Sequence, residues 1–371
     1  MRQSLCILSV AVRGFRNLAH VDIAPSARFN VIAGENGQGK TNLLEAIYVL
    51  ATSKSFRAQK PGDLVTHGGA AASVKGVISR GDTRATQTLG VAQGSRRAQV
   101  DGKRPPSLLA YALRTPVVVF HPGEIALSMG AGAERRRLLD RVVLYLSPLG
   151  AAELSSYGRA LRARQRTLEA RGSTASDLDE WEELIVRHGS AVITARREAA
   201  ERLKHAAVLA FQEIAAAGAV MDVRYASGAP SDARLFREAL ATQRAQDQRR
   251  GVATTGPHRD DLVISLDGQL ARRTASQGQH RLIVLSLKVA EVEVVGSARQ
   301  TRPLLLLDDV SSELDRHRTT SLFRRLRSHQ GQVFLTTTRP ELIETGPGLL
   351  PEDRLDFMVS SGVVIRAERP G

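Results

Sequence analysis

Two short motifs far apart in the sequence place the strongest constraint on the fold of this chain of 371 residues. The first, Gly34–Thr41 (GENGQGKT), matches the phosphate-loop pattern G-x-x-x-x-G-K-[ST]. The second is a run of four leucines, 304–307, followed by Asp308 and Asp309, which is typical of a buried strand ending in two carboxylates. Thr41 and Asp308 are 267 positions apart. The two motifs predict one ATP site whose halves are separated by a large insertion.

The residues around the first motif have the context that a phosphate loop requires. The apolar run 28–33 predicts a strand and 41–50 has the spacing of a helix, so the glycines lie at a strand-to-helix turn. Backbone N–H groups and the helix N-terminus there can bind phosphate. Lys40 would bind the β- and γ-phosphates as a catalytic residue, and Thr41 would bind Mg²⁺. The predicted nucleotide-binding residues are Gly34, Glu35, Asn36, Gly37, Gln38, Gly39, Lys40 and Thr41.

The residues around the second motif complete the predicted site. Asp308 should emerge at the carboxyl end of a central strand and bind Mg²⁺ together with Thr41. Asp309 is the candidate to polarise the attacking water. Upstream, Ser276 is a good N-cap for the helix that follows, and such a helix end can bind an anion. Taken alone, a serine in this position is more often an ordinary helix cap than part of an anion site.

In this order the motifs resemble the ABC-type ATPase heads of SMC and Rad50 proteins, and the RecF family in particular. The resemblance covers most of the chain and is most specific at 34–48 (GENGQGKTNLLEAIY). Other segments that carry it are 14–17 (GFRN), 53–57 (SKSFR), 255–261 (TGPHRDD), 276–279 (SQGQ) and 306–315. It implies an α/β fold, in which a mixed β-sheet lobe and a phosphate-loop core carry an inserted, short, α-helical, coiled-coil-like domain.

The resemblance also implies a function. Two copies would form an ATP-dependent homodimer that binds gapped or single-strand-containing DNA in recombinational repair, replication and the SOS response. With the RecO and RecR proteins it would assist RecA loading, using ATP and Mg²⁺. The signature motif of one copy would cap the ATP bound by the other, and Ser312 and Asp315 would form the D-loop. The signature residues are Ser276, Gln277, Gly278 and Gln279.

Some positions depart from related patterns. ABC transporters have a glutamate where this chain has Asp309 and a histidine in the switch strand, where this chain has 336–338 (TTT). The shorter carboxylate predicts a weak, slow ATPase. An inserted Gly123 displaces Glu124 from its family position, which leaves its role open. Two alternatives remain, a transporter ATPase subunit and a small-molecule kinase with a phosphate loop; the long insertion and the signature motif favour the DNA-binding ATPase.

Composition indicates the kind of partner and the compartment. The formal charge of +14 favours a phosphate polymer, although the 45 arginines against 7 lysines equally fit a bias in genome base composition. Aromatic residues make up only 4%, so backbone contacts rather than base stacking are expected. Cys6 is the only cysteine, which suits a reducing cytoplasm. The apolar runs are too short to span a bilayer, so no membrane partner is expected.

The character of the sequence changes along the chain. We predict an ATPase lobe with the phosphate loop at 1–127, a helical insertion at 128–250, and the remaining ATPase part with signature motif and carboxylates at 251–371. Residues 131–250 contain 20 basic and 16 acidic residues, so the charge excess lies mainly outside the insertion. Two features stay open: 135–137 (RRR) is either a solvated helix face or a phosphate contact, and His258 is either structural or functional.

Overall fold

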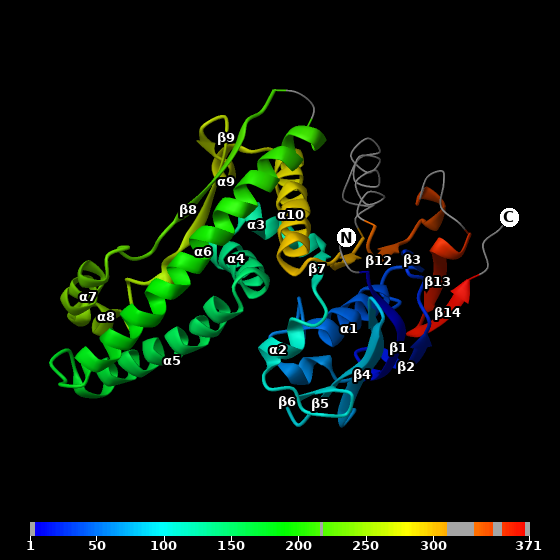
Figure 1. Ribbon diagram of the computed structural model, residues 1–371, viewed down its shortest axis with the longest axis horizontal. Helices are drawn as coiled ribbons and strands as arrows, with labels where there is room; N and C mark the ends of the chain where they lie inside the picture. Colours follow the sequence, from blue (N-terminus) through cyan, green and yellow to red (C-terminus); the bar gives the residue numbers. More distant parts are fainter. Residues whose placement is uncertain (1–3, 216–217, 310–329, 344–350, 368–371) are drawn as a thin grey trace. The chain divides into compact units, whose positions relative to one another are not determined.

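The computed structural model describes residues 4–215, 218–309, 330–343 and 351–367 and divides into two compact units. Unit 1 comprises 1–124 and 295–371, and unit 2 comprises 125–294 (Figure 1). The first boundary lies close to the predicted 127/128. The second lies at 294/295 rather than 250/251: β8 (Met221–Ala226), within the predicted insertion, pairs with β9 (Asp261–Leu266), beyond it, and most of the helix Gln277–Arg299 also belongs to unit 2. These are compact units of the fold; the division into an ATPase head and a helical insertion at 128–250 stays a prediction.

A six-stranded sheet forms the centre of unit 1, in the order β14-β13-β3-β12-β11-β7. All neighbours are parallel except the edge strand β14. Every residue of β3, β7, β11 and β12 is buried, which explains why β7 and β11 are entirely apolar and β3 and β12 mostly so. The strands are β3 (Phe29–Ala33), β7 (Val117–Phe120), β11 (Leu304–Leu307), β12 (Val333–Thr337), β13 (Arg354–Ser360) and β14 (Val363–Ala367).

A five-stranded antiparallel sheet, in the order β2-β1-β4-β5-β6, forms the rest of the unit 1 framework. Its alternating sequence puts Val74, Leu89 and Ala98 into the core, in register with one another across β4, β5 and β6. The Gln332 side chain, fully buried, joins the two sheets by hydrogen bonds to the backbone of Ile7. The strands are β1 (Leu5–Phe15), β2 (Leu18–Ile23), β4 (Ala71–Arg80), β5 (Thr83–Ala92) and β6 (Ser95–Val100).

The helices of unit 1 are few among the described residues. Helix α1 (Lys40–Thr52) directly follows the phosphate loop and packs between the two sheets, with most of its side chains buried. The short elements are α2 (Leu108–Ala112), η1 (Pro61–Leu64), η2 (Pro122–Ile125, whose last residue lies in unit 2), η4 (Pro340–Leu342) and η5 (Pro351–Asp353).

Unit 2 is built on a helical hairpin of α5 (Pro148–Arg171) and α6 (Leu178–Ile214). The small and polar residues at 172–176 (GSTAS) predict a turn, and this segment does lie between the two helices. A buried ion-pair cluster holds one end of the hairpin: Arg164, fully buried, donates to Glu182 on α6 and Asp247 on α8. The other elements are α3 (Ala126–Met129), α4 (Gly132–Leu146), α7 (Ala233–Thr242), α8 (Arg244–Arg250), η3 (Pro257–Arg259), α9 (Ala271–Thr274), β10 (Gln269–Leu270) and most of α10 (Gln277–Arg299).

Within the described ranges, no helix has both the length and the apolar character needed to cross a bilayer.

Candidate functional site

The phosphate loop joins β3 to α1, and its backbone can be formed only by glycine at two positions. Gly34 and Gly39 have φ values of +151° and +117°, which L-residues with side chains rarely adopt. A Cβ atom at Gly34 would lie 2.3 Å from the carbonyl oxygen of Val359, and one at Gly39 would lie 2.8 Å from the Asn17 side chain. Since Gly39 provides no side-chain cap, the first N–H groups of α1 stay available for an anion.

Lys40 crosses the loop from the first position of α1. Its Nζ donates to the carbonyl oxygens of Gly34 at 2.7 Å and Glu35 at 2.9 Å, and the side chain is 6% exposed. Burial lowers the pKa of Lys40, and the charges of Asp309, Asp308 and Glu35 oppose that shift. The loop therefore holds its cation among backbone carbonyls and close to carboxylates.

Thr41 and Asp308 meet, although 267 residues separate them in the chain. Thr41 Oγ1 donates to Asp308 Oδ1 at 2.8 Å, and Thr336 Oγ1 donates to the same oxygen at 2.9 Å. Asp308 is 5% exposed and directly follows β11, and Asp309 comes next in a left-handed conformation with φ +49°. One hydroxyl and one carboxylate are oxygen ligands of the kind that Mg²⁺ takes beside substrate phosphates and water. The described residues contain no cluster of three His, Cys, Asp or Glu, so this pair is the candidate for Mg²⁺.

The signature residues lie in unit 2 at the start of α10. Gln279 N donates to Ser276 Oγ at 3.3 Å, and Ser276 N donates to Gln279 Oε1 at 2.8 Å, which together form a reciprocal capping box. Ser276 and Gln277 are exposed, so this helix end is open to solvent. The D-loop candidates Ser312 and Asp315 lie outside the residues that the structure describes.

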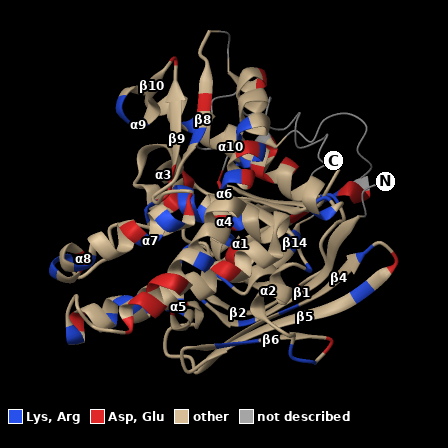
Figure 2. Ribbon diagram, turned by 60° about the vertical axis from the view of Figure 1, so that its left-hand side comes forward, with Lys and Arg blue, Asp and Glu red and all other residues tan. Residues whose placement is uncertain are grey.

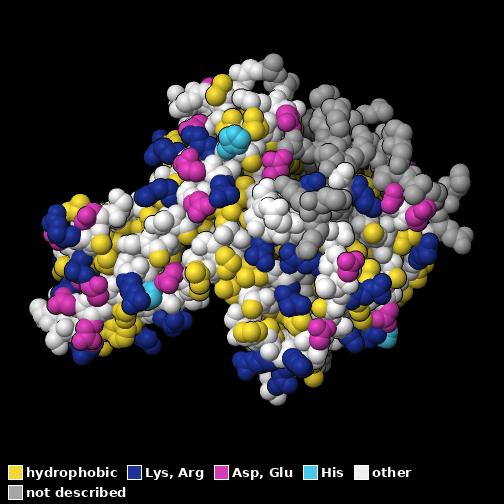
Figure 3. All heavy atoms as spheres, in the orientation of Figure 1, with side chains coloured by type: hydrophobic (Ala, Val, Ile, Leu, Met, Phe, Trp, Pro, Cys, Tyr) yellow, Lys and Arg dark blue, Asp and Glu magenta, His cyan; other side chains and the backbone are white. Residues whose placement is uncertain are grey.

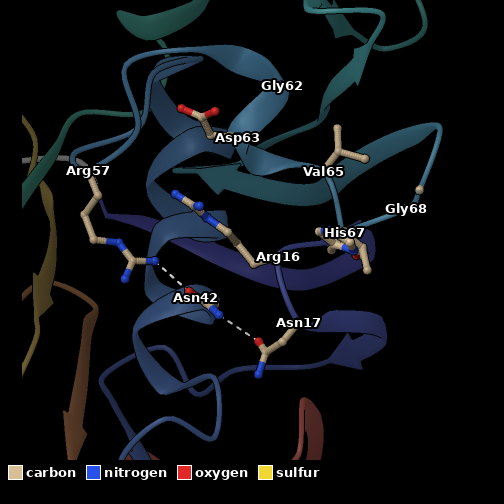
Figure 4. A pocket seen from close by; sticks show the side chains of 11 residues that line it. Arg16, Asn17, Asn42, Arg57, Gly62, Asp63, Val65, His67 and Gly68 are labelled. Carbon is tan, nitrogen blue, oxygen red and sulfur yellow. Dashed lines mark hydrogen bonds between the residues drawn. The ribbon is translucent and has the colours of Figure 1, made fainter.

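A polar network beside the phosphate loop is absent from the sequence-based site. Glu45 of α1 is fully buried and pairs with Arg16 at 3.0 Å and Arg57 at 2.5 Å, while Ser55 donates to it at 2.5 Å. Arg57 also donates to Asn42, the residue after Thr41 (Figure 4). The sequence did contain a signal for this network, since segments 14–17 and 53–57 both carry the family resemblance. Their spacing in the chain does not show that Arg16 and Arg57 both contact Glu45.

This network borders a pocket of about 820 Å³ in unit 1 (Figure 4). Asn42 Nδ2 donates to Asn17 Oδ1 at 2.7 Å, and Asn17 Nδ2 donates to the carbonyl oxygen of Gln38 in the phosphate loop at 3.1 Å. The pocket therefore adjoins the loop and has a mainly polar wall. The remaining residues that line it are Arg16, Arg57, Gly62, Asp63, Val65, Thr66, His67, Gly68 and Gly69.

Glu45→Gln is expected to lower the free energy of unfolding by about 3 kcal/mol at pH 7, because it leaves two arginines beside a buried neutral amide. Hydrogen bonds and ion pairs from Arg16, Ser55 and Arg57 outweigh burial and lower the pKa of Glu45. The contribution of the Glu45 carboxylate to the free energy of unfolding is therefore complete above the unfolded-state pKa of about 4.3. It is lost as the pH falls through the lower pKa of the folded state. Urea unfolding between pH 3 and 7 measures this.

The control is Glu198→Gln, which breaks an exposed pair with Arg202 on α6 and should change stability by less than about 1 kcal/mol. A destabilisation by Glu45→Gln that is just as large at pH 3 as at pH 7 would contradict the role given to the carboxylate charge.

Two features that the sequence left open have defined contacts in unit 2. His258 Nδ1 accepts from Tyr157 Oη at 2.6 Å and His258 Nε2 donates to the carbonyl oxygen of Ala253 at 2.8 Å, while burial lowers the pKa of the histidine. The three arginines at 135–137 do not share one environment. Arg135 is 3% exposed and binds both oxygens of Asp261, so neither a solvated face nor a phosphate contact describes it; Arg137 alone is well exposed.

Glu124 also has a defined place. It follows β7, 6% exposed, with Oε1 3.7 Å from Nε2 of His121, whose ring stacks on Phe56. Asp308 N donates to the carbonyl oxygen of Phe120, the last residue of β7, and β7 pairs with β11. Glu124 therefore follows the strand next to the one that Asp308 follows.

Comparison with known proteins extends over the whole chain. Residues 6–105 match the model of the RecF/RecN/SMC N terminal domain. A DNA replication and repair protein RecF from Anaeromyxobacter sp. (strain Fw109-5) is 42% identical over 96% of this chain and 98% of its own length. Its counterpart from Geobacter sp. (strain M21) is 35% identical over 97% of this chain and 99% of its own.

Solved structures agree with these sequence matches. The recombination mediator protein RecF-ATPrS in the RecFOR pathway superposes with a TM-score of 0.88 at 27% identity, covering 99% of this chain and 100% of that one. The Smc head domain with an extended coiled coil from Pyrococcus furiosus reaches 0.56 at 15% identity, over 98% of this chain and 96% of that one. The second match shows the fold alone, and it is the ABC-type head that the sequence predicted.

Proposed function

The chain belongs to the RecF family of DNA replication and repair proteins, and on that basis we propose that it is an ATP-gated, dimeric DNA clamp. The observation that carries the proposal is the meeting of Thr41 and Asp308 beside Lys40 at the phosphate loop. Full-length similarity to RecF proteins favours this function over a transporter subunit or a small-molecule kinase.

Each part of the site has a proposed role. The loop Gly34–Thr41 holds the phosphates of ATP through backbone N–H groups and Lys40. Thr41 and Asp308 hold Mg²⁺, which when bound neutralises phosphate charge. Asp309 orients the attacking water, and its short side chain makes hydrolysis slow. The polar pocket beside Asn17 and Asn42 adjoins this loop.

The dimer provides the gate. We assign the exposed signature motif, Ser276–Gln279, to the ATP bound by a second copy, so that the γ-phosphate links the two subunits only while it is present. Ser312 and Asp315 are assigned to the same interface on family resemblance alone. RecO and RecR as partners, assistance to RecA loading, and a cytoplasmic location belong to the proposal on the same ground.

The charge distribution supports DNA as the partner of unit 1. Residues 1–124 contain 16 Lys and Arg against 7 Asp and Glu, whereas the rest of the chain contains 36 against 31. The strands β4, β5 and β6 contain no acidic residue. Figure 2 shows basic residues along these strands and acidic ones at the turns, and Figure 3 shows Lys and Arg side chains over the same end of unit 1. Most of the excess positive charge thus belongs to the first part of unit 1.

Strand register places three exposed cations on one face of the antiparallel sheet. Lys75, Arg84 and Arg97 alternate with the buried Val74, Leu89 and Ala98, so they point away from the core. None of these three cations forms an ion pair with a described residue. The neighbouring side chains on this face are Ser73, Thr86, Thr88 and Gly90, together with one apolar residue, Val77, opposite Thr86. A basic face whose named residues include no aromatic side chain suits phosphate contacts rather than base stacking or a protein hot spot.

A DNA titration tests both the gate and this face. Binding of a gapped duplex is measured with ATP, with ADP and without nucleotide, at several salt concentrations, with light scattering for mass. We expect ATP to tighten binding about tenfold or more and to double the mass from 40.1 kDa. The logarithm of the DNA-binding constant should fall linearly with the logarithm of the salt concentration, and we call the steepness of this fall the salt slope. The double variant Lys75→Ala/Arg97→Ala should reduce the salt slope by about 2, since each phosphate contact contributes about 0.9.

Arg202→Ala/Arg234→Ala is the control, because it removes two exposed arginines from unit 2 and should leave the slope unchanged. Equal DNA affinity and mass under all three nucleotide conditions would contradict the clamp. A wild-type slope for Lys75→Ala/Arg97→Ala would place the DNA on another surface.

A further inference from the structure

Thr336 lies at the point where the two halves of the proposed ATP site come together. Its strand β12 is central in the sheet, between β3, which leads into the phosphate loop, and β11, which Asp308 directly follows. Leu335 pairs with Leu307 of β11, so the next residues along the parallel strands are Thr336 and Asp308. On the other side Thr336 pairs with Ile32, two residues before Gly34. Thr336 therefore adjoins both halves.

The Thr336 hydroxyl bonds to both consecutive aspartates. Oγ1 donates to Asp308 Oδ1 at 2.9 Å and accepts from the backbone N–H of Asp309 at 2.9 Å. A hydroxyl has one donor hydrogen, so the contact to the carboxylate uses it and the lone pairs face the amide. The side chain is 1% exposed, which removes competing water. Both bonds are thus directional and shielded from solvent.

These two bonds act on different properties of the aspartates. Asp308 Oδ1 already accepts from Thr41, so a second hydroxyl restricts the rotation of the carboxylate further. Asp309 has φ +49°, a conformation that costs about 1 kcal/mol or more outside glycine. The bond from its N–H to Thr336 stabilises that backbone and so directs the Asp309 side chain.

We infer that Thr336 is a positioning residue that orients Asp308 toward the Mg²⁺ site and holds Asp309 in place for water activation. This inference rests on the proposed function. A purely structural strand-end threonine would affect stability alone, whereas a positioning residue also changes how strongly Mg²⁺ promotes ATP binding. The two roles therefore differ in the gain in ATP affinity on adding Mg²⁺, which can be measured without ATP hydrolysis.

Thr336→Val tests the inference, because valine has nearly the same shape and strand preference but no hydroxyl. We expect hydrolysis to fall about 10- to 100-fold, on the scale of one or two unsatisfied buried groups. By calorimetry, the gain in ATP affinity on adding Mg²⁺ should shrink about tenfold, while affinity without Mg²⁺ stays within about twofold. Thr336→Ser keeps the hydroxyl and should restore both quantities.

Thr337→Val is the matched control. Thr337 is fully buried on the opposite face of β12, and its hydroxyl accepts from the backbone N–H of Arg339. Its replacement should change stability but not the Mg²⁺-dependent gain. If Thr336→Val fails to fold, Thr336→Cys, a weaker donor of similar size, should give an intermediate effect.

The outcomes separate this inference from the proposed function. If the wild type hydrolyses ATP and Thr336→Val matches it in rate and in Mg²⁺-dependent gain, the positioning role is wrong and the clamp stands. If Thr336→Val and Thr337→Val lose the same amount in both quantities, the role is structural. Absence of Mg²⁺-dependent ATP binding by the wild type would overturn the proposed function itself.

Discussion

Replacing Ser276 by arginine is expected to abolish ATP-dependent dimerisation and to remove the gain in DNA affinity of about tenfold or more that ATP gives, while a single subunit still binds ATP. The long side chain would fill the exposed start of α10, where the γ-phosphate of a second copy is proposed to enter. Loss of the capping box costs only about 1 kcal/mol, so the helix should persist. Light scattering with ATP and DNA titration with and without ATP measure the effect, and calorimetry reports ATP binding by the subunit.

Ser155→Arg is the control, since it adds the same side chain to an exposed position of α5. If Ser276→Arg forms the ATP-dependent dimer as the wild type does, the signature motif has no role across the interface. If it loses ATP binding as well, the substitution has disturbed more than the interface.

Lys40→Ala is expected to weaken ATP binding about 10- to 100-fold, as charge-assisted hydrogen bonds contribute about 1.5–3 kcal/mol. The lysine is the cation that the loop holds between its carbonyls and the carboxylates. Without ATP bound, the dimer and its grip on DNA should be lost, whereas DNA binding without nucleotide should persist. Calorimetry with ATP, followed by DNA titration with and without ATP, measures both parts.

Lys60→Ala removes an exposed lysine from the same unit and should leave ATP affinity within about twofold of the wild type. Wild-type ATP affinity in Lys40→Ala would show that nucleotide binds elsewhere. Loss of nucleotide-independent DNA binding would mean that the basic face and the ATP site are not separable.

Local sequence was sufficient to predict the elements that are buried on both faces. The apolar-rich run 28–33 and the four leucines at 304–307 predict strands, and β3 and β11 occur there, because a parallel strand covered on both sides needs few polar positions. The turn at 172–176 follows from a cluster of small and polar residues between two helical patterns. The pairing of β8 with β9 was not predicted, because non-local strand pairing leaves little trace in the spacing of either segment.

The candidate site likewise contains residues that the sequence predicted and residues that it did not. Residue types in the two motifs predicted that Thr41 and Asp308 belong to one site, since a phosphate loop needs a carboxylate on a neighbouring strand, and they lie 2.8 Å apart. The network of Glu45 with Arg16 and Arg57 was not predicted, since a buried ion pair depends on which segments pack against α1. The burial of Arg135 was missed for the same reason: three consecutive arginines face different directions on a helix.

The sequence by itself determined the family, the phosphate loop and its carboxylate partners, because these depend on residue types at short, fixed spacings. Tertiary structure alone decided three things: that Thr336 bonds to both aspartates, that Glu45 holds two arginines beside the loop, and that Lys75 and Arg97 share a face. Each of these depends on strand order, register or helix packing. Those properties arise from contacts between segments distant in the chain, and no local pattern specifies them.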